Sequence, residues 1–537
     1  MWTAFVLLLL SVGLRGGAAA DQGGSDAEPG GNTHRRSAGS SGFHLLVVPM
    51  DGSHWVGLKA LAQELGRRGH RVTVVMPEVT LRIGPGAHYD SVTYPVPYDR
   101  DTVDRVLNLQ DVMQTPSGSL LGRFRRRLDH IQGIRTLIHS GAESLLFNTS
   151  LVTHLSQQGF HAVLTDPMVP TGNLIARKFG IPAVNLLRGL LFSLDTRSAG
   201  CPSPPSYVPR FFTGFLDRMS FMERTLNTLV ALVEPLLSRL LYRHFDHIAH
   251  RFLGEEVTVA EVLSDAAVWL QRTDVIFETP RPLMPNIIHI GGINCHIRNP
   301  LPKDLESWVS GGHGFVVFTL GSAISHMPEE KASVFLEAFR RIPHKVIWRY
   351  AGPVPDGVPD NVKMMEWVPQ NDLLAHPGAR AFITHAGSHG LYEGLCHAVP
   401  MVMLPLGAEQ PDNARKFAQK GVGVVLDIQT LTTEILLQGL SDVINNTRYK
   451  QNVRRLSTLH RDRPVDPLEL AVFWTEFVMR HRGAPHLRPA ALHLHWVQYF
   501  CLDVITLLLA ALLLVGMLTW RCCRRCFRKR GLKRKLD

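Results

Sequence analysis

The segment from Trp367 to Asn413 combines aromatic, amide, imidazole and carboxylate side chains at short intervals, a set that suits a phosphorylated ligand. Residues 381–384 (AFIT) are predicted to form a short apolar strand, and residues 385–390 (HAGSHG) a turn that opens a helix. A helix N-terminus presents unpaired N–H groups and a partial positive charge, so it can hold a diphosphate without a metal ion. The pattern therefore predicts binding of a nucleotide-activated sugar, with Glu393 within reach of ribose hydroxyls.

The same segment closely resembles the signature of the family 1 UDP-glycosyltransferases, and within that family it is most similar to the microsomal UDP-glucuronosyltransferases. The resemblance extends from residues 44–55 (HLLVVPMDGSHW) to residues 460–491, so that it leaves out little more than the N-terminal segment. It implies the two-domain GT-B fold and transfer of glucuronic acid from UDP-glucuronate to a hydroxyl, or a similar nucleophile, of small lipophilic acceptors. The implied transfer inverts the anomeric carbon, needs no metal and uses no cofactor beyond the UDP-sugar.

The base for this chemistry is predicted to be His54, in the DGSHW sequence where the resembling family places its catalytic histidine. An attacking hydroxyl must lose its proton as the new bond forms, and an imidazole with a pKa of about 6.5 suits proton abstraction at neutral pH. Asp166, in LTDP at the end of another strand, matches the partner acid of the family. It would fix the tautomer of His54 and stabilise the imidazolium. A lone histidine in a turn more often caps a helix or lies at the surface, but the paired acid and the donor motif favour catalysis.

Contacts to the donor are expected at the matching motif positions. Trp367 is expected to stack on uracil with Gln370 beside it, although core packing is the ordinary role of a tryptophan. Glu409 and Gln410 are expected to bind the sugar hydroxyls. The predicted diphosphate contacts are His385, the N–H groups of Gly387, Ser388 and His389, and Ser322 in the sequence FTLGS.

Two departures from the family pattern affect the donor sugar. Glu409 stands where the family usually has Asp, and Gly407 stands where it usually has Phe. UDP-glucose, UDP-galactose and UDP-N-acetylglucosamine therefore remain alternative donors. The carboxylate of glucuronate favours a bidentate arginine, and Arg272 and Arg349 are the candidates, with a purely structural role as an equal alternative for both.

The sequence disfavours two functions of other classes. A non-catalytic UDP-sugar-binding partner of an active transferase would not need both His54 and Asp166. An NAD-dependent dehydrogenase is disfavoured because no GxGxxG turn is followed by an acid at the ribose position. No DxD-like acid pair marks a diphosphate-bound metal, so no metal site is predicted.

The elements that must position these residues alternate between strand and helix in both halves of the chain. Residues 44–50, 51–70 and 71–77 have the spacing of a strand, a helix and a strand, which predicts a parallel βαβ unit. The pattern restarts at Gly314, after a polar seam rich in Gly and Pro at residues 296–313. We expect an α/β protein with two Rossmann-like domains, 43–295 for the acceptor and 314–495 for the donor, facing across a cleft. The cleft would lie at the carboxyl ends of the strands, and the helical segment 466–481 would cross back to the first domain.

The length and the charge of the chain agree with this plan. At 537 residues the chain is too long for a single core. Its net charge is +11, but residues 521–537 hold nine Lys or Arg and one acid, a local +8 that leaves only +3 for the rest. The basic character is therefore a property of the tail, and nucleic acid is not an expected partner.

The basic tail follows an apolar run without charges at residues 504–520, which an aromatic rim at residues 496–500 extends. Residues 496–520 approach the length that spans a bilayer and are predicted to be a single transmembrane helix, with a buried core helix as the alternative. By the positive-inside rule, the tail at 521–537 is cytosolic and the rest of the chain lies across the membrane. Lys533 and Lys535 match a dilysine retrieval pattern of the endoplasmic reticulum, which basic tails also produce by chance.

The N-terminal sequence supports this topology. Residues 1–20 have the apolar stretch and small-residue end of a signal peptide, though without a basic start, and residues 21–42 are polar and predicted to be disordered. Asn148 and Asn445 lie in sequons for glycosylation in the secretory lumen, although such sequons are frequent by chance. We therefore expect a single-pass protein of the endoplasmic reticulum membrane with luminal catalytic domains.

Cysteine usage adds little to the prediction. Of seven cysteines, four lie in or beside the membrane segment, which leaves Cys201, Cys295 and Cys396 in the lumen. Three are too few for a disulfide framework, their pairing stays open, and no CxxC pairs with a second one to build a zinc site. The tail sequence CCRRC is typical of palmitoylation.

The region expected to receive the acceptor is residues 211–242, which are strongly apolar with helical spacing. They suit either docking on the membrane with entry of lipophilic acceptors, or a helix pair that covers the first domain. The acceptor itself stays open. A homo- or hetero-oligomer with related transferases is a further expected partner, as in the resembling family.

Overall fold

The computed structural model describes residues 42–107, 120–189, 192–211, 213–296, 299–321, 324 and 327–533. Ser322, the predicted signal peptide and almost all of the predicted disordered segment lie outside this range. The chain forms two compact units, residues 1–487 and 488–537, which are described separately. Residues 488–495, predicted as the end of the second domain, belong to the second of these units.

The first half of the chain contains a parallel sheet of seven strands, in which apolar runs are buried on both faces, as expected of parallel sheets. The predicted βαβ unit is present, because β1 pairs in parallel with β2 on one side and with β4 on the other. The strands, in sheet order, are β3 (Asp90–Tyr94), β2 (Arg71–Pro77), β1 (His44–Val48), β4 (Ala162–Thr165), β5 (Ala183–Leu187), β6 (Val268–Gln271) and β7 (Ile287–His289).

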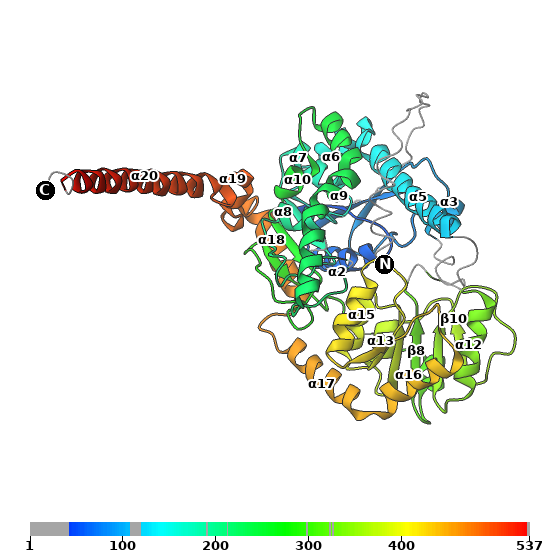
Figure 1. Ribbon diagram of the computed structural model, residues 1–537. Coiled ribbons are helices and arrows are strands. Elements are labelled where there is room, and N and C mark those ends of the chain that lie inside the picture. Colours follow the sequence, from blue (N-terminus) through cyan, green and yellow to red (C-terminus); the bar gives the residue numbers. More distant parts are fainter. Residues whose placement is uncertain are drawn as a thin grey trace. The chain divides into compact units, whose positions relative to one another are not determined.

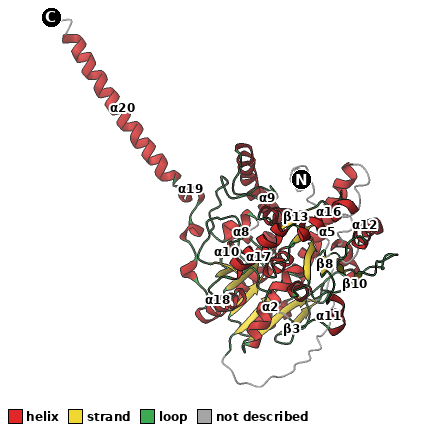
Figure 2. Cartoon of the chain, turned by 90° about the horizontal axis from the view of Figure 1, so that it is seen from below, coloured by secondary structure: helices red, strands yellow, loops and turns green. Residues whose placement is uncertain are grey.

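Helices cover both faces of this sheet (Figures 1 and 2). Side chains of one face pack with α2 (Ser53–Arg67) and α18 (Pro467–His481). Those of the other face pack with helices that lie between β3 and β6 in the sequence. The predicted return helix is therefore confirmed: α18 comes from the end of the second domain and packs on α2 of the first. The helices of the other face include α5 (Leu120–Leu146), α6 (Thr149–Ser156), α7 (Thr171–Phe179), α9 (Phe221–Leu253) and α10 (Val259–Ser264).

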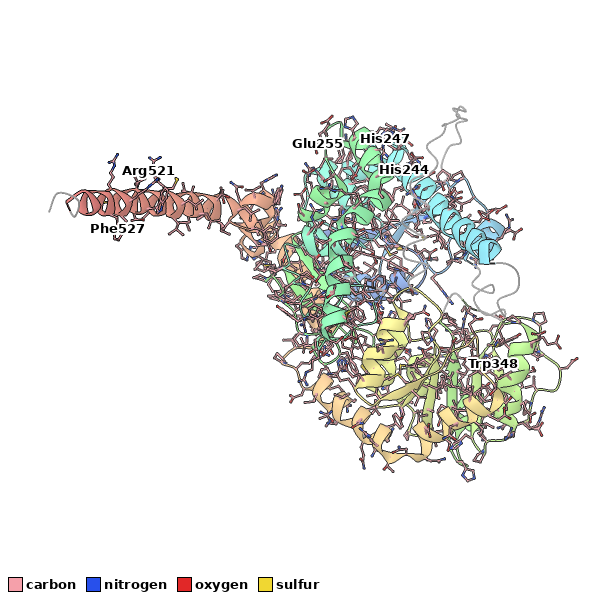
Figure 3. The ribbon with its side chains drawn as sticks, in the orientation of Figure 1. His244, His247, Glu255, Trp348, Arg521 and Phe527 are labelled. Carbon is pink, nitrogen blue, oxygen red and sulfur yellow. A yellow bond between two sulfur atoms is a disulfide. The ribbon has the colours of Figure 1, made fainter. Side chains whose placement is uncertain are left out.

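The second half repeats the architecture with a parallel sheet of six strands. Trp348 of β9 is 1% exposed and stacks on Phe318 of β8 at 4.9 Å between ring centroids, in the core beneath α12 (Figure 3). The strands, in sheet order, are β10 (Val362–Met365), β9 (Lys345–Arg349), β8 (Phe315–Thr319), β11 (Ala379–Thr384), β12 (Met401–Met403) and β13 (Gly423–Val425). The helices that matter below are α11 (Lys303–Val309), α12 (Glu329–Arg340), α13 (Gln370–Ala375), α14 (Ser388–Cys396), α15 (Gln410–Gln419), α16 (Thr433–Asn445) and α17 (Thr447–Arg461).

The connection between the halves carries a disulfide, which answers the question that the sequence left open. Cys295, which follows β7, is bonded to Cys396, the last residue of α14. The predicted linker at residues 296–313 contains α11, whose buried Leu305 and Val309 pack in the second domain. The connection between the two halves is therefore tied to the second domain by covalent and apolar contacts.

The apolar segment at residues 211–242 shows features of both interpretations. Within this segment α9 buries Val230 and Leu237, and beyond it the same helix buries Phe245, Ile248 and Phe252 in the core of the first domain. Its first part exposes a stripe, here called the α9 stripe, that consists of Phe221, Met222, Leu229, Leu232 and Leu236. One helix thus covers the domain at one end and presents an apolar surface at the other.

The second unit contains the predicted membrane segment. Residues Leu502–Arg525 of α20 (Leu502–Lys533) have a mean hydropathy of 2.4 and are long enough to cross a membrane. Within the described part of the chain, this is the one helix with that length and composition. The short α19 (Trp496–Tyr499) precedes it and supplies the exposed aromatic residues Trp496 and Tyr499 of the predicted rim.

Candidate functional site

The predicted catalytic pair is assembled by neighbouring strands. His54 lies in the first turn of α2, just after β1, and Asp166 directly follows β4. Because β1 and β4 are parallel neighbours, their carboxyl ends meet at one edge of the sheet. His54 Nδ1 lies 2.6 Å from Asp166 Oδ2, although the residues are 112 positions apart. Both residues are buried, with exposed fractions of 6% and 2%.

The electrostatics of this pair suit a neutral base. Burial lowers the pKa of His54, and Arg188 lowers it further, while Asp166 opposes both. Burial would raise the pKa of Asp166, but its interactions with His54, with the N–H of Met168 and with Arg188 outweigh burial, and the pKa is lowered. Asp166 is therefore a carboxylate that accepts from Nδ1–H of His54, an assignment of the proton that follows from the hydrogen bond. The opposite nitrogen, Nε2, is left to accept a proton.

A large apolar cavity of about 780 Å³ opens beside His54. Aliphatic side chains from the strand ends and from α5 supply much of its wall, and Arg82 and Arg349 lie at its lining. Pockets of this size and character accommodate small organic molecules. Its aliphatic lining includes Val48, Val75, Ile83, Ile134, Leu137 and Leu145.

The predicted diphosphate turn begins α14, with Gly387 as its N-cap residue and Ser388 as its first residue. The imidazole of His385 lies against Gly321 and Gly387, where an added Cβ would come within 2.4 and 2.5 Å of the ring. Among the described residues, its Nδ1 has no hydrogen-bond partner. Burial lowers the pKa of His385 to about 4, so the ring is neutral and would bind a phosphate oxygen as an N–H donor.

His389, the second residue of α14, faces the first domain. Its Nε2 lies 3.3 Å from Asn294 Nδ2. Burial lowers its pKa well below the ordinary value, so it is neutral as well. The partial positive charge at the N-terminus of α14 therefore comes from the helix itself and not from imidazolium side chains.

The carboxyl group of Glu393 is tied to the predicted uracil contact. Gln370 Nε2 donates to Glu393 Oε2 at 2.5 Å, and Thr319 donates its hydroxyl to Gln370 Oε1. Gln370, predicted to lie beside uracil, and Glu393, predicted to reach the ribose, are therefore in direct contact. Burial raises the pKa of Glu393 to about 7, although the hydrogen bond from Gln370 and the charge of Arg272 act in the opposite direction.

Trp367 lies at the surface and is 59% exposed. Arg82 of the first domain lies over its ring, 4.3 Å from the centroid, and Arg349 lies at 5.5 Å. A guanidinium stacked on an aromatic face occupies the kind of position that a base would take. Stacking of uracil on that face would thus require Arg82 to move.

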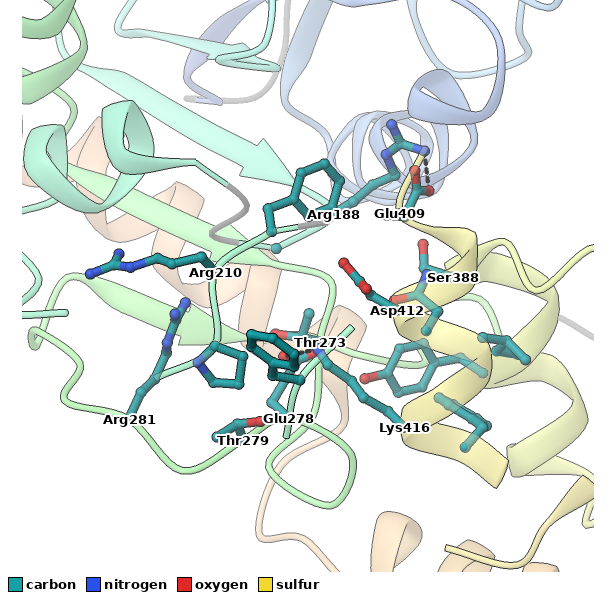
Figure 4. Close-up of a pocket in the computed structure, with 18 residues that line it drawn as sticks. Arg188, Arg210, Thr273, Glu278, Thr279, Arg281, Ser388, Glu409, Asp412 and Lys416 are labelled. Atoms are coloured by element: carbon teal, nitrogen blue, oxygen red, sulfur yellow. Dashed lines mark hydrogen bonds and ion pairs between the residues drawn. The ribbon is translucent and has the colours of Figure 1, made fainter. Parts of the chain in front are cut away.

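Glu409, predicted to bind the sugar, contacts the first domain. It is 5% exposed and forms an ion pair with Arg188 of the first domain, with Nη1 to Oε1 at 2.5 Å (Figure 4). Gln410 Oε1 accepts from the N–H groups of Leu406 and Gly407 at 2.8 and 3.2 Å. Its amide nitrogen is therefore the group able to donate to a sugar hydroxyl.

The two arginine candidates differ in their surroundings. Arg349 Nη1 donates to the carbonyl oxygen of Ile324 at 3.0 Å and to that of Gly321, which is a structural role. Arg272 is 4% exposed and donates to the carbonyl oxygen of Ser53, beside the catalytic pair, at 3.3 Å. Arg272 is thus the candidate that lies beside the predicted catalytic pair.

Arg188 was missed in the sequence. It follows β5, the strand next to β4, and therefore ends at the same edge of the sheet as Asp166. The position of an arginine directly after a buried strand was the available signal. The residue contributes a second cation to the region of Arg272, and each lowers the pKa of groups nearby.

The sequons occupy different local settings. Asn148 caps α6, and its Oδ1 accepts from the N–H of Leu151 at 3.1 Å. Asn445 is exposed near the end of α16, where its Nδ2 donates to Ser441 at 3.1 Å. The exposed Asn445 is the more accessible of the two.

Glu393→Gln is expected to alter the dependence of stability on pH. The pKa of Glu393 is about 7 in the folded protein and 4.5 ordinarily, so between these values the folded form binds more protons than the unfolded chain. The free energy of unfolding therefore falls as pH rises through this window. The variant should lack this loss, which is on the order of 1–3 kcal/mol. Thermal unfolding of the detergent-solubilised chain from pH 4.5 to 7.5 measures it, with Glu330→Gln, an exposed carboxyl on α12, as control. Parallel pH profiles of parent and variant would contradict the assignment.

Comparison with known proteins places this geometry in context. A family model described as "UDP-glucoronosyl and UDP-glucosyl transferase" matches residues 43–535. UDP-glucuronosyltransferase 1A5 of Rattus norvegicus is 45% identical over 504 residues, which are 92% of this chain and 94% of that protein. UDP-glucuronosyltransferase 1A1 of Homo sapiens is 45% identical over 497 residues, which are 91% of this chain and 93% of that protein.

Solved structures agree at the level of the fold. The spinosyn forosaminyltransferase SpnP superposes with a TM-score of 0.56 at 20% identity, over 82% of this chain and 100% of that one. The calicheamicin glycosyltransferase CalG4 superposes with a TM-score of 0.53 at 19% identity, over 82% and 99%. These neighbours are glycosyltransferases of the GT-B fold, which confirms the predicted architecture of two parallel sheets.

Proposed function

We propose, from the premise that this chain belongs to the UDP-glucuronosyl and UDP-glucosyl transferase family, that it transfers glucuronic acid from UDP-glucuronate to a hydroxyl of small lipophilic acceptors. One observation carries the proposal. The buried His54–Asp166 pair lies beside an apolar cavity of about 780 Å³ in the domain that faces the donor turn.

The geometry supports a single displacement at the anomeric carbon. The acceptor oxygen forms a bond to that carbon while the bond to the β-phosphate oxygen of UDP breaks, and UDP leaves with the electron pair. Nε2 of His54 takes the acceptor proton, and Asp166 stabilises the imidazolium. Attack opposite to the leaving group inverts the configuration and turns an α-linked donor into a β-glucuronide.

The leaving diphosphate is proposed to be stabilised without a metal. The N-terminus of α14, with the N–H groups of Gly387, Ser388 and His389, offers partial positive charge at this point. His385 adds a neutral N–H donor with no described protein partner on Nδ1. This arrangement supports a metal-independent and cofactor-independent reaction.

The preference for glucuronate is proposed to come from arginines at the cleft. Arg272 lies beside His54, and Arg188 is held by Glu409 across the cleft. A sugar carboxylate would find a guanidinium there, whereas a neutral hexose would leave these cations without a new partner. The departures at Gly407 and Glu409 leave UDP-glucose, UDP-galactose and UDP-N-acetylglucosamine as alternative donors, and the following experiment distinguishes them from UDP-glucuronate.

In the test, membranes that contain the chain are supplied with one of four donors: UDP-glucuronate, UDP-glucose, UDP-galactose or UDP-N-acetylglucosamine. Each donor is combined with a panel of phenols and steroids, and products are detected by mass spectrometry. A glucuronide formed equally with and without EDTA supports the proposal. A hexoside changes the donor and keeps the mechanism. Loss of turnover with EDTA that divalent ions restore removes the metal-independent step. UDP-sugar binding without any product favours the non-catalytic partner.

Gly321→Ala is expected to weaken UDP binding about tenfold or more. An added Cβ would lie 2.4 Å from His385, so the ring must leave its place, and a hydrogen bond to a charged group is worth about 1.5–3 kcal/mol. Gly311→Ala is the matched control, because Gly311 has the same kind of positive φ (81° against 79°) but nothing within 4 Å. Calorimetric titration with UDP measures both. Equal losses in the two variants would show backbone strain alone and contradict the role of His385.

The chain is further proposed to be a single-pass protein of the endoplasmic reticulum membrane with a luminal catalytic unit and a cytosolic tail. The spanning length of α20 and its basic end support this orientation. Glycosylation at the exposed Asn445, seen as an endoglycosidase H-sensitive mass shift, tests it. An unglycosylated Asn445 together with protease sensitivity of the catalytic unit in sealed microsomes would reverse the orientation. A homo- or hetero-oligomer is proposed as well, and cross-linking in those microsomes that yields only the monomer would remove it.

The α9 stripe is proposed to contact the membrane and admit lipophilic acceptors. Leu232 and Leu236 are 72% and 56% exposed, a contiguous apolar surface that water disfavours. A photoactivatable label confined to the lipid phase is expected to modify this stripe in microsomes, and the double variant Leu232→Gln, Leu236→Gln is expected to reduce that labelling severalfold. Leu459 on α17, 47% exposed and apolar, is the internal control. Labelling of Leu459 equal to that of the stripe would refute the contact.

A further inference from the structure

Three side chains from distant parts of the sequence meet at the seam between the two sheets. They are Cys295 after β7, Cys396 at the end of α14 and His460 near the end of α17. Their ligand atoms all lie within 4.8 Å of one another, and the exposed fractions of the residues are 7%, 4% and 3%. Among the described residues, this is the one group of His, Cys, Asp or Glu with that geometry. Two sulfurs and an imidazole form a set that soft and borderline metal ions favour.

The imidazole of His460 is aimed at the sulfurs by its hydrogen bond on the other side. Its Nδ1 lies 2.7 Å from Asp274 Oδ2, and Arg463 also donates to that carboxylate. Arg463 Nη2 lies 3.2 Å from His460 Nε2 as well, so this guanidinium must move aside when Nε2 binds a metal ion. A Cβ added at Gly292 would lie 2.5 Å from His460 Nε2 and 3.2 Å from Cys295 Sγ. Nε2 and Sγ therefore border the same small space, which glycine keeps open. A carboxylate behind the far nitrogen is the arrangement that orients a metal-binding histidine.

We propose that Cys295, Cys396 and His460 bind one zinc-like metal ion when the two cysteines are reduced, and that the disulfide is the alternative form that excludes it. A thiol reductant breaks the S–S bond, so the protein gains two thiols and the reductant becomes a disulfide. The metal then replaces the two thiol protons, which are released. Three protein ligands leave one position for water, as in open zinc sites.

Spacing in the sequence did not reveal this site, because its two cysteines are 101 residues apart and neither belongs to a CxxC motif. Its place in the fold gives it a consequence. Cys396 ends the helix whose first residue is Ser388, and Cys295 lies in the turn that follows β7, the last strand of the first sheet. Either the disulfide or the bound metal ion would tie α14 to the connection between the two halves of the chain. The inference concerns metal binding and does not rest on the proposed transferase activity.

The experiment uses the full chain in detergent with Cys201, Cys501, Cys522, Cys523 and Cys526 replaced by serine, so that only the paired cysteines remain. The purified protein is divided into two samples. One is kept oxidised, and the other is reduced with dithiothreitol and desalted without oxygen. Each is titrated with Co²⁺, whose visible absorption is strong in tetrahedral thiolate sites, and the bound cobalt is then displaced with Zn²⁺.

The expected result is one Co²⁺ per reduced chain, none per oxidised chain, and loss of the visible band with Zn²⁺. Asp274→Asn should weaken the affinity about 10- to 100-fold through the orientation of His460. His460→Gln should change the band and weaken binding by at least as much. A reduced chain without the band, equal binding before and after reduction, or a band unchanged in His460→Gln overturns the proposal. The first two outcomes need no variant of the site, so a folding defect in a variant does not obscure the answer.

Discussion

His54→Ala is expected to lower kcat by about two to four orders of magnitude while UDP binding persists, because the variant loses only the base that takes the acceptor proton. His54 is 6% exposed and its Nδ1 is engaged by Asp166 at 2.6 Å, so Nε2 is the atom presented to the acceptor. Burial and Arg188 lower the pKa of His54 and keep the ring neutral at neutral pH. Bulk water does not replace a base that is positioned and desolvated, so the loss should appear in kcat.

Single-turnover kinetics with saturating UDP-glucuronate measure the chemical step, and calorimetry measures the UDP affinity. His130→Ala is the matched control, since His130 lines the same cavity without contacting Asp166 in any described hydrogen bond. It should change KM for the acceptor by severalfold at most. A His54→Ala enzyme with near-parental turnover would remove His54 from the mechanism, and one that also lost UDP affinity would indicate a structural role.

The resemblance to the family assigned the roles of His54 and Asp166, and short-range patterns explain why the two residues lie together. His54 and Asp166 each follow an apolar run of the kind that forms buried parallel strands. Side chains that follow such strands gather at one edge of the sheet, wherever they lie in the sequence. The donor turn from His385 to Ser388 was predictable for a similar reason, since glycine punctuation between a strand and a helix fixes its local shape.

The contacts between the domains were not predictable in the same way. The ion pair of Arg188 with Glu409 and the position of Arg82 over Trp367 depend on how two separate sheets are placed across the cleft. No periodicity within one domain encodes that placement. Membership in the family gives the motif positions, but it assigns no partner to an arginine outside the motifs.

The bond between Cys295 and Cys396 belongs to the same class of contact. Its two residues come from the turn after β7 and from the last position of α14, 101 positions apart. A count of cysteines alone left their pairing open. Sequence patterns thus predict which residues gather at the edge of one sheet, while the structure supplies the contacts that depend on both sheets.

Asp166→Asn is expected to lower kcat by about three to four orders of magnitude, although the side chain keeps its size. Oδ2 of Asp166 accepts from His54 Nδ1, and Oδ1 accepts from the N–H of Met168 at 3.0 Å. An amide in this place either loses the negative charge that stabilises the imidazolium or turns its NH₂ toward Nδ1. The second arrangement forces the proton onto Nε2, where the base must be free. UDP affinity should be retained, because the residue lies outside the donor motif.

The double variant His54→Ala, Asp166→Asn gives the sharper measurement. If Asp166 acts through His54, the double variant should be no slower than His54→Ala alone, because groups that act as a unit are strongly non-additive. Losses in kcat that multiply would instead show that Asp166 contributes independently, for example by stabilising the fold at the end of β4. Thermal unfolding of the three variants separates that case, since the residue is 2% exposed and a structural role would lower Tm in step with kcat. The double-mutant cycle therefore tests directly whether the imidazole and the carboxylate act together as one base.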